Sequence, residues 1–197
     1  MAKLDMILDL VHRNNGIITT SQVVEAGISR GNLKYAVDNG HLERAARGVY
    51  TLPEVWEDDF VSMQNQYKRG IYSLDTVLFL HDLIDRTPIH YHMTFPSHYN
   101  VSRPKQEGII CKTIKNSLYD IGITDVMTPS GNVVKGYSME RTLCDILKPK
   151  NKIDIQVITD AFKRYVKRKD RNIPLLSHYA NLLKVQDKVR SYLEVLL

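Results

Sequence analysis

The first fifty residues carry a pattern of short helices and a hairpin that few folds accommodate. Leu4, Ile7, Leu8 and Val11 recur at positions i, i+3, i+4 and i+7, which predicts a helix over residues 3–13. Asparagines and a glycine follow at residues 14–16 and predict its end. A single apolar stripe of this kind must be buried against further elements, so the segments that follow decide the fold.

Two more short helices follow, joined by a tight turn. Thr19 or Thr20 is expected to cap the second helix, and Ser29 to cap a third that runs to Asn39. The link between them contains Gly27, and glycine adopts a positive φ at little cost. Two short helices joined in this way predict a helix-turn-helix.

A β-hairpin is predicted directly after the third helix. Residues 42–45 and 49–52 are short strand candidates, the turn at 46–48 has Arg47 at its tip, and Pro53 ends the second strand. Three helices followed by a two-stranded hairpin indicate a winged helix-turn-helix.

The third helix and the hairpin carry side chains suited to DNA. Arginine pairs with guanine and asparagine with adenine, while serine, lysine and tyrosine hold phosphates. The candidate DNA-binding residues here are Ser29, Arg30, Asn32, Lys34, Tyr35, Arg44 and Arg47. The alternative is a winged helix that docks proteins, with these cations solvated.

Positive charge is concentrated near the end of the chain. Residues 1–52 hold six basic and five acidic side chains (net +1), residues 53–147 nine and twelve (net −3), and residues 148–197 twelve and five (net +7). On a continuous helix the run 163–171 would form one cationic face able to hold DNA phosphates. The alternative is that this face is only solvated and binds nothing. The candidate residues are Lys163, Arg164, Lys167, Arg168, Lys169 and Arg171.

Residues 16–50 resemble the N-terminal domain of AbiEi antitoxins, the transcriptional regulators of type IV abortive-infection toxin–antitoxin systems. The most specific part is residues 42–50, which end in Arg-Gly-Val-Tyr, and residues 72–81 and 136–147 also fit the family. The resemblance implies a repressor that binds double-stranded DNA at inverted repeats in its own promoter. It also implies that the chain counteracts a nucleotidyltransferase-like toxin without a stable complex. Separately, the chain is expected to be a monomer in solution and to bind DNA in more than one copy.

The rest of the chain predicts a second domain that contains both strands and helices. Strands are expected at residues 89–95, 109–114 and 133–137, with helices starting at Ser73 and Ser138. Helices over 153–166 and 174–197 are expected to end the chain. The predicted fold class is α+β: an N-terminal winged helix-turn-helix at residues 1–60, then a mixed α/β C-terminal domain at 61–197 with a small sheet and a helical end.

No catalytic, metal or cofactor site is expected. The sequence has no P-loop, GxSxG, HExxH or GxGxxG motif. Arg141 and Asp145, spaced i and i+4, are expected to form a surface ion pair. The four histidines at 81, 90, 92 and 98 are interpreted as exposed strand residues, with His90 and His92 on one strand face. Two cysteines and no long apolar run favour a reduced cytoplasmic protein without a membrane span.

Overall fold

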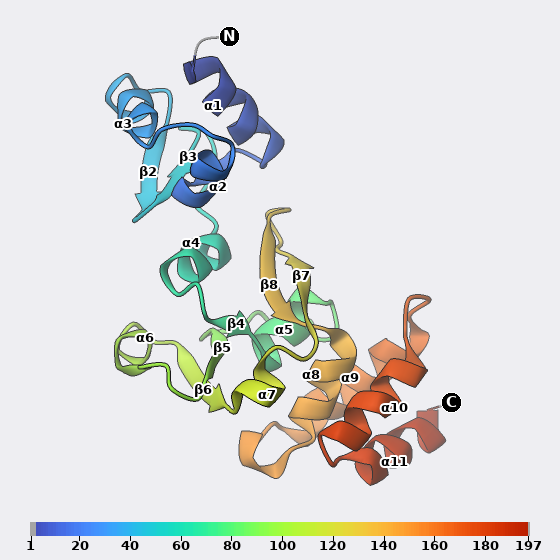
Figure 1. The fold of residues 1–197 in the computed structure, drawn as a ribbon. Helices are drawn as coiled ribbons and strands as arrows, with labels where there is room; N and C mark the ends of the chain where they lie inside the picture. Colours follow the sequence, from blue (N-terminus) through green and yellow to red (C-terminus); the bar gives the residue numbers. More distant parts are fainter. Residues whose placement is uncertain (1–2, 197) are drawn as a thin grey trace. The chain divides into compact units, whose positions relative to one another are not determined.

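The computed structural model describes residues 3–196, and these form an α+β fold (Figure 1). The chain divides into two compact units, one made of the residues up to Lys68 together with 127–134, the other of residues 69–126 and 135–197. The sequence-based division into domains 1–60 and 61–197 stays a prediction about which parts fold independently.

The first unit is a winged helix-turn-helix, as the sequence predicts. Its strands form a three-stranded antiparallel sheet in the order β1-β3-β2, in which Ile18 faces Tyr50 and Ala46 faces Val49. The elements are α1 (Lys3–Arg13), β1 (Ile17–Thr19), α2 (Thr20–Glu25), α3 (Gly31–Asp38), β2 (Glu43–Ala46), β3 (Val49–Thr51) and α4 (Asp59–Gln66).

One apolar cluster holds this unit together. Ile7 and Val11 of α1 are fully buried and belong to one cluster with Leu33 and Ala36 of α3. The turn after α1 needs Gly16, because its φ is +80° and a Cβ there would lie 2.5 Å from the Val55 side chain. The chain is thus brought sharply from α1 into β1, which places α2 and α3 beside the sheet.

The second unit contains a five-stranded mixed sheet in the order β6-β5-β4-β8-β7. The β4 strand pairs antiparallel with β5 and parallel with β8, and β5 pairs parallel with β6. The elements before the C-terminal helices are β4 (Ile71–Tyr72), α5 (Leu74–Leu80), β5 (His92–Pro96), α6 (Ser102–Gln106), β6 (Ile110–Ile114), α7 (Asn116–Tyr119), β7 (Ile123–Met127) and β8 (Val133–Tyr137).

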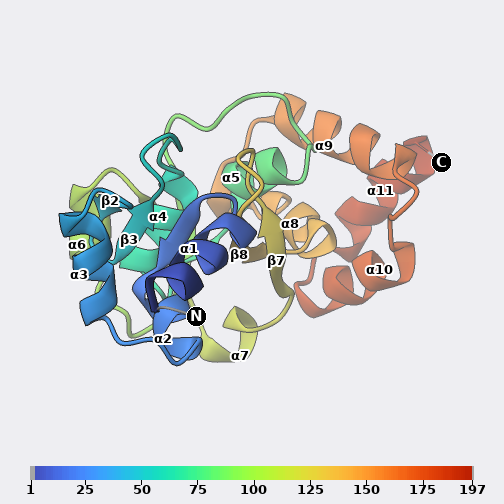
Figure 2. The ribbon, with the colours of Figure 1, turned by 90° about the horizontal axis from the view of Figure 1, so that it is seen from above.

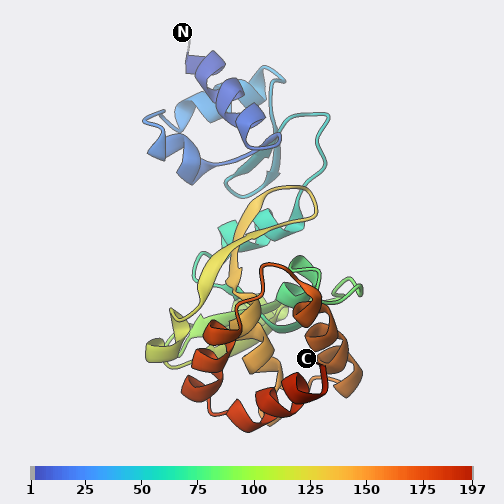
Figure 3. The same ribbon diagram turned by 90° about the vertical axis from the view of Figure 1, so that its right-hand side faces the viewer.

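The C-terminal helices pack around a buried helix. They are α8 (Met139–Ile146), a 3₁₀ turn at Pro149–Asn151, α9 (Ile155–Lys167), α10 (Ile173–Leu182) and α11 (Gln186–Leu196). The α8 helix packs against α5, α9 and α10, and α11 packs against α9 and α10 (Figures 2 and 3).

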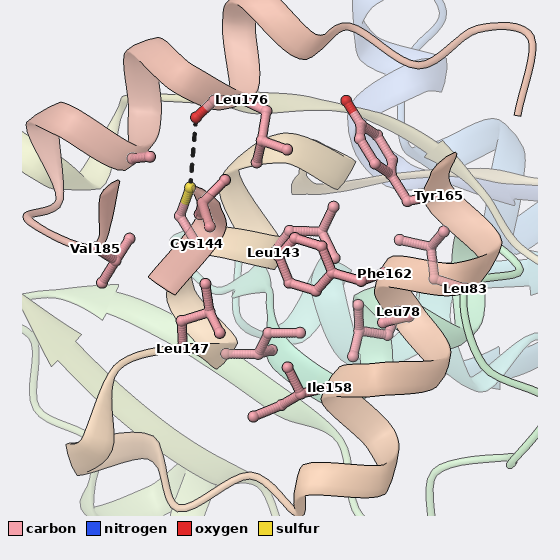
Figure 4. Packing of buried hydrophobic residues seen from close by; sticks show 14 of the residues in the cluster. Leu78, Leu83, Leu143, Cys144, Leu147, Ile158, Phe162, Tyr165, Leu176 and Val185 are labelled. Atoms are coloured by element: carbon pink, nitrogen blue, oxygen red, sulfur yellow. Dashed lines mark hydrogen bonds between the residues drawn. The ribbon is translucent and has the colours of Figure 1, made fainter. Parts of the chain in front are cut away.

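Side chains from these helices meet in the core shown in Figure 4, where Leu143 of α8 lies beside Phe162 of α9. The Cys144 thiol donates to the Leu176 carbonyl at 3.8 Å, and Phe162 stacks on Tyr192 with ring centroids 4.6 Å apart. The unit is therefore held by helices packed around α8, one of which, α5, also packs on β5 of the sheet.

Several predicted boundaries in this unit are wrong. The strand predicted at 89–95 begins only at His92, and β4 and β7 were not predicted. The helix predicted over 174–197 is two helices, because Leu183 and Val185 turn into the core while Lys184 between them takes a left-handed φ of +58°. Among the described helices, none has the length and apolar character needed to cross a membrane.

Candidate nucleic-acid interface

The α2 helix begins with a reciprocal cap. The Thr19 hydroxyl accepts a hydrogen bond from the backbone N–H of Gln22 at 3.3 Å. In return, the Gln22 side-chain oxygen accepts one from the backbone N–H of Thr19 at 2.8 Å. Of the two predicted caps, Thr19 is therefore the one used. At the other end Gly27 has a φ of +75° and directs Ile28 into the core, which starts the turn toward α3.

The α3 helix begins one residue later than predicted. Ser29 was expected to cap it, but the cap position is Arg30, which already has helical dihedral angles. The Ser29 hydroxyl instead accepts a long hydrogen bond from the Gly31 amide at 3.4 Å. Leu33 and Ala36 bury the inner face of the helix, so the opposite face is left to solvent.

That outer face carries the predicted contact residues. Arg30, Lys34 and Tyr35 are exposed, and neither cation takes part in an ion pair within residues 3–196. Ser29 is exposed as well. Asn32 differs, because it is half-buried and its amide donates to the Ser29 carbonyl at 3.1 Å. One N–H of the Asn32 amide is therefore engaged, and its other N–H and its Oδ1 remain for a base.

The wing is fixed by its neighbours, while its cations are exposed. The Arg47 carbonyl accepts from the Asn65 side chain at 2.9 Å, and the Gly48 carbonyl accepts from the Thr20 amide at 2.9 Å. Both Arg44 and Arg47 are exposed. The turn is thus held by α2 and α4, and its arginine side chains extend into solvent.

The basic run of the second unit is not one helical face. The α9 helix ends at Lys167, and Arg168 is extended with a ψ of 142°, so Arg171 lies beyond the helix. Arg164 pairs with Asp85, and Arg168 pairs with Asp170 at 2.8 Å. The hydrogen bond from Arg168 also lowers the pKa of Asp170 from its ordinary value. The predicted continuous cationic face through Arg171 is therefore wrong.

Two further contacts tie the end of this run to the protein. Arg168 donates to the His81 carbonyl at 3.0 Å, and Arg171 donates to the Arg168 carbonyl at 2.8 Å. The lysines at 163, 167 and 169 are exposed and have no ion pair in the described part of the chain. Asp170, within the run, was the sequence signal that some of this charge is compensated.

The expected surface ion pair of Arg141 and Asp145 is buried. Arg141 is 1% exposed, and its Nε lies 2.9 Å from the Asp145 carboxylate. Its Nη1 donates to the carbonyls of Leu118 at 2.9 Å and Ile121 at 2.8 Å. The prediction fails because other elements pack around α8 and bury the pair, so that Arg141 joins α8 to the segment around α7.

This ion pair has further cations around it. Lys148 lies 2.8 Å and Lys112 3.8 Å from the Asp145 carboxylate. Burial alone would raise the pKa of Asp145, but Arg141, Lys112 and Lys148 together hold it below its ordinary value. Burial lowers the pKa of Lys112 to about 8, against the attraction of Asp145.

The histidines do not form one exposed set. His90 and His98 are exposed, but neither lies in β5. His81 is half-buried with Nε2 2.9 Å from the Tyr137 carbonyl, and His92 is half-buried on β5. Burial lowers the pKa of both. Within residues 3–196, no group of three or more histidine, cysteine or carboxylate side chains is arranged to hold a metal ion.

Comparison with known proteins identifies residues 5–53, a part of the first unit. Residues 5–53 match the AbiEi_4 family model, described as "Transcriptional regulator, AbiEi antitoxin". No curated protein matches the chain. Among solved structures, the chain is similar to the RV2827C protein from Mycobacterium tuberculosis, with 12% identity, a TM-score of 0.49, and coverage of 94% of this chain and 78% of that one. Residues 5–53 form an AbiEi-type transcriptional-regulator domain, which confirms the resemblance over this segment.

Proposed function

We propose that the chain is a sequence-specific DNA-binding antitoxin that represses its own toxin–antitoxin operon at inverted repeats in the promoter. The observation that carries the proposal is the AbiEi-type domain at residues 5–53, folded as a winged helix with an exposed polar face on α3. A helix of this kind enters the major groove, whose base edges distinguish all four base pairs.

Base reading and phosphate binding fall to different residues. Arg30 has the fork geometry that pairs bidentately with guanine, and Asn32 has the amide that pairs with adenine. The phosphate contacts are assigned to Ser29, Lys34 and Tyr35 on α3 and to Arg44 and Arg47 on the wing. The N-terminus of α3 adds partial positive charge at the DNA surface.

The second unit adds cations that would bind DNA whatever its base sequence. Lys163, Lys167 and Lys169 are exposed without ion pairs among the described residues, so each can neutralise a phosphate. Arg164, Arg168 and Arg171 contribute less, because each is engaged within the protein. Their contact with DNA would have to use the remaining N–H donors of each guanidinium or displace those bonds.

The regulatory role includes a toxin partner. We propose that a nucleotidyltransferase-like toxin is counteracted without a stable complex, and that a cytoplasmic monomer occupies the repeats in more than one copy. The competing candidate is a winged helix that neutralises a partner by direct docking. One observation favours it: Trp56, in the loop between β3 and α4, is 90% exposed, and aromatic residues are enriched in protein interfaces.

Gel-shift titration on the chain's own promoter tests the proposal. Binding that requires intact inverted repeats and falls when they are scrambled is the expected result. Co-purification of chain and toxin at physiological salt, with no promoter binding, would instead establish the docking alternative. Sedimentation with and without the promoter fragment measures the number of copies in each state.

A further inference from the structure

The β6 strand forms one edge of the five-stranded sheet (Figure 1). It pairs in parallel with β5, and the N–H of Ile110, its first residue, donates to the Tyr91 carbonyl at 2.9 Å. In a parallel pair, alternate residues of a strand direct their backbone groups to the partner and away from it. Counted from Ile110, the N–H and C=O groups of Cys111 and Thr113 therefore point away from the sheet.

These outward groups have no backbone partner in the described part of the chain. Two donors and two acceptors follow one another on a strand without a proline or a bulge, and such an edge is a template for another strand. A shallow hollow of about 350 Å³, lined by residues 108–111, His90 and Lys105, lies beside the start of the strand. The edge therefore has both the backbone groups and the space for an extended segment.

The side chains along this edge carry an excess of positive charge. Residues 103–115 hold four basic and one acidic side chain (net +3), and that acid, Glu107, is already bound by an arginine of α6 at 3.1 Å. In the middle of β6 the Lys112 ammonium lies 3.8 Å from the buried Asp145 carboxylate. That carboxylate also pairs with Arg141 and Lys148, so three cations share one anion. A segment that docks on this edge is therefore favoured when it carries a carboxylate.

The same charge argues against a second copy of the chain as the occupant. An antiparallel pair that uses all the outward groups sets Cys111 of one copy opposite Thr113 of the other. Lys112 of each copy would then lie opposite Lys112 of the other, and like charges directly opposite each other are destabilising. Lysine in an edge strand is a common protection against such self-pairing.

We propose that the outer edge of β6 binds an extended, acidic segment of another protein as an additional antiparallel strand. The backbone of the segment bonds to Cys111 and Thr113, and its carboxylate lies opposite Lys112. Ile110, which is 46% exposed, and Ile114 lie on the same face, two positions to either side of Lys112. Apolar side chains are therefore expected two positions to either side of the carboxylate. The site goes beyond the DNA-binding role and does not depend on it.

A capped peptide of sequence Val-Thr-Glu-Thr-Val tests the proposal when it is titrated into the isotopically labelled full chain and followed by NMR. Its glutamate is placed opposite Lys112, and the N–H groups of its threonines face β6. Saturable binding is expected, with slower amide hydrogen exchange at Cys111 and Thr113. Exchange at Lys112 should not change, because its N–H is directed to β5. No saturable binding at millimolar peptide, or protection confined to other parts of the chain, overturns the proposal.

Two altered peptides separate backbone pairing from charge. Methylation of both threonine nitrogens removes the N–H groups that face β6 and should abolish binding. Replacement of the glutamate by lysine should weaken binding roughly three- to tenfold, because a like charge then lies opposite Lys112. Lys112→Met should remove the difference between the glutamate and lysine peptides. Full binding of the methylated peptide would overturn the strand pairing, and equal binding of the lysine peptide to the wild type would overturn the acidic segment.

A matched pair of variants locates the binding. Thr113→Pro removes one outward N–H and leaves the bonds to β5 in place, and proline is tolerated at such edge positions. It should weaken peptide binding at least about tenfold, whereas Thr113→Ala, which keeps the N–H, should bind like the wild type. Circular dichroism checks that Thr113→Pro is folded, and the methylated peptide tests the same pairing without any change to the protein. Equal affinity of the two folded variants would refute this site.

Sedimentation of the full chain at increasing concentration tests the other occupant. The chain is expected to form no dimer through β6, because of the opposed lysines. A dimer that Thr113→Pro abolishes and Thr113→Ala retains would show that a second copy occupies the edge, and would overturn the assignment to another protein.

Discussion

The Asp58 carboxylate accepts a hydrogen bond from the Thr128 hydroxyl at 2.6 Å, joining two buried residues seventy positions apart. The same carboxylate accepts from the Asn132 side chain at 2.9 Å and from the Phe60 amide at 3.0 Å, where it caps α4. Asn15 adds a bond to the Gly131 carbonyl at 2.7 Å. These bonds make residues 127–134 part of the first unit, although the sequence places them far from the winged helix.

Replacing Asp58 with alanine should destabilise the first unit by about 2–4 kcal/mol, because Thr128 and Asn132 would lose the acceptor of their buried donors. Urea unfolding followed by circular dichroism measures the loss. Asp59→Ala, at the exposed neighbouring carboxylate, is the control and should change little. Equal stability of the two variants would show that the buried network contributes nothing.

Arg30→Ala should weaken promoter binding by about 1–3 kcal/mol and relax the preference at one base position, because a bidentate base contact is lost. Gel-shift titration against operators mutated at each position measures both effects. Arg13→Ala removes the same charge from an exposed residue that is paired with Asp9 at 2.8 Å, and it should leave specificity intact. A uniform loss across all operators would reassign Arg30 to phosphate contact.

The double variant Lys163→Ala with Lys167→Ala should weaken binding to every DNA sequence alike. Each lost phosphate contact reduces the slope of log affinity against log salt by about 0.9, so the slope should fall by roughly two. Affinities measured at several salt concentrations give this slope. Lys105→Ala with Lys115→Ala removes equal charge from exposed residues elsewhere in the second unit. The same slope change in both pairs would mean that only net charge matters.

The winged helix was predictable because its signals are local. A helical apolar stripe, a cap at Thr19, a glycine at 27 and strand-forming residues around Gly48 each act within a few positions. The sheet of the second unit was less predictable, because β4 is only two residues long and pairs with β5 and β8 from distant parts of the chain. Such a strand carries no periodicity of its own.

Burial of charge was the main failure of the sequence interpretation. The i, i+4 spacing of Arg141 and Asp145 is the same for an exposed pair and a buried one, and only the packing of α5, α9 and α10 around α8 decides between them. The partner of Arg164 was equally hidden, since Asp85 lies seventy-nine positions away. Sequence reasoning therefore found the residue types of the candidate interface and overestimated how many of its cations face solvent.

Lys112 makes stability depend on pH above neutrality. Its pKa in the folded protein is about 8, mainly through burial, whereas an unfolded lysine has a pKa of about 10.4. Between these values the unfolded chain binds more protons, so the contribution of Lys112 to folding becomes more favourable as the pH rises. Below pH 8 the cost of its buried charge is fully present.

Lys112→Met should abolish this dependence, because the methionine side chain is of similar length and does not titrate. Denaturant midpoints at pH 7, 8.5 and 10 should show the wild type gaining stability relative to the variant as the pH rises. Lys115→Met, at an exposed lysine close by in the chain, should run parallel to the wild type. If the Lys112→Met curve also ran parallel, the folded and unfolded pKa values of Lys112 would be the same, and the buried lysine would carry no pH-dependent cost.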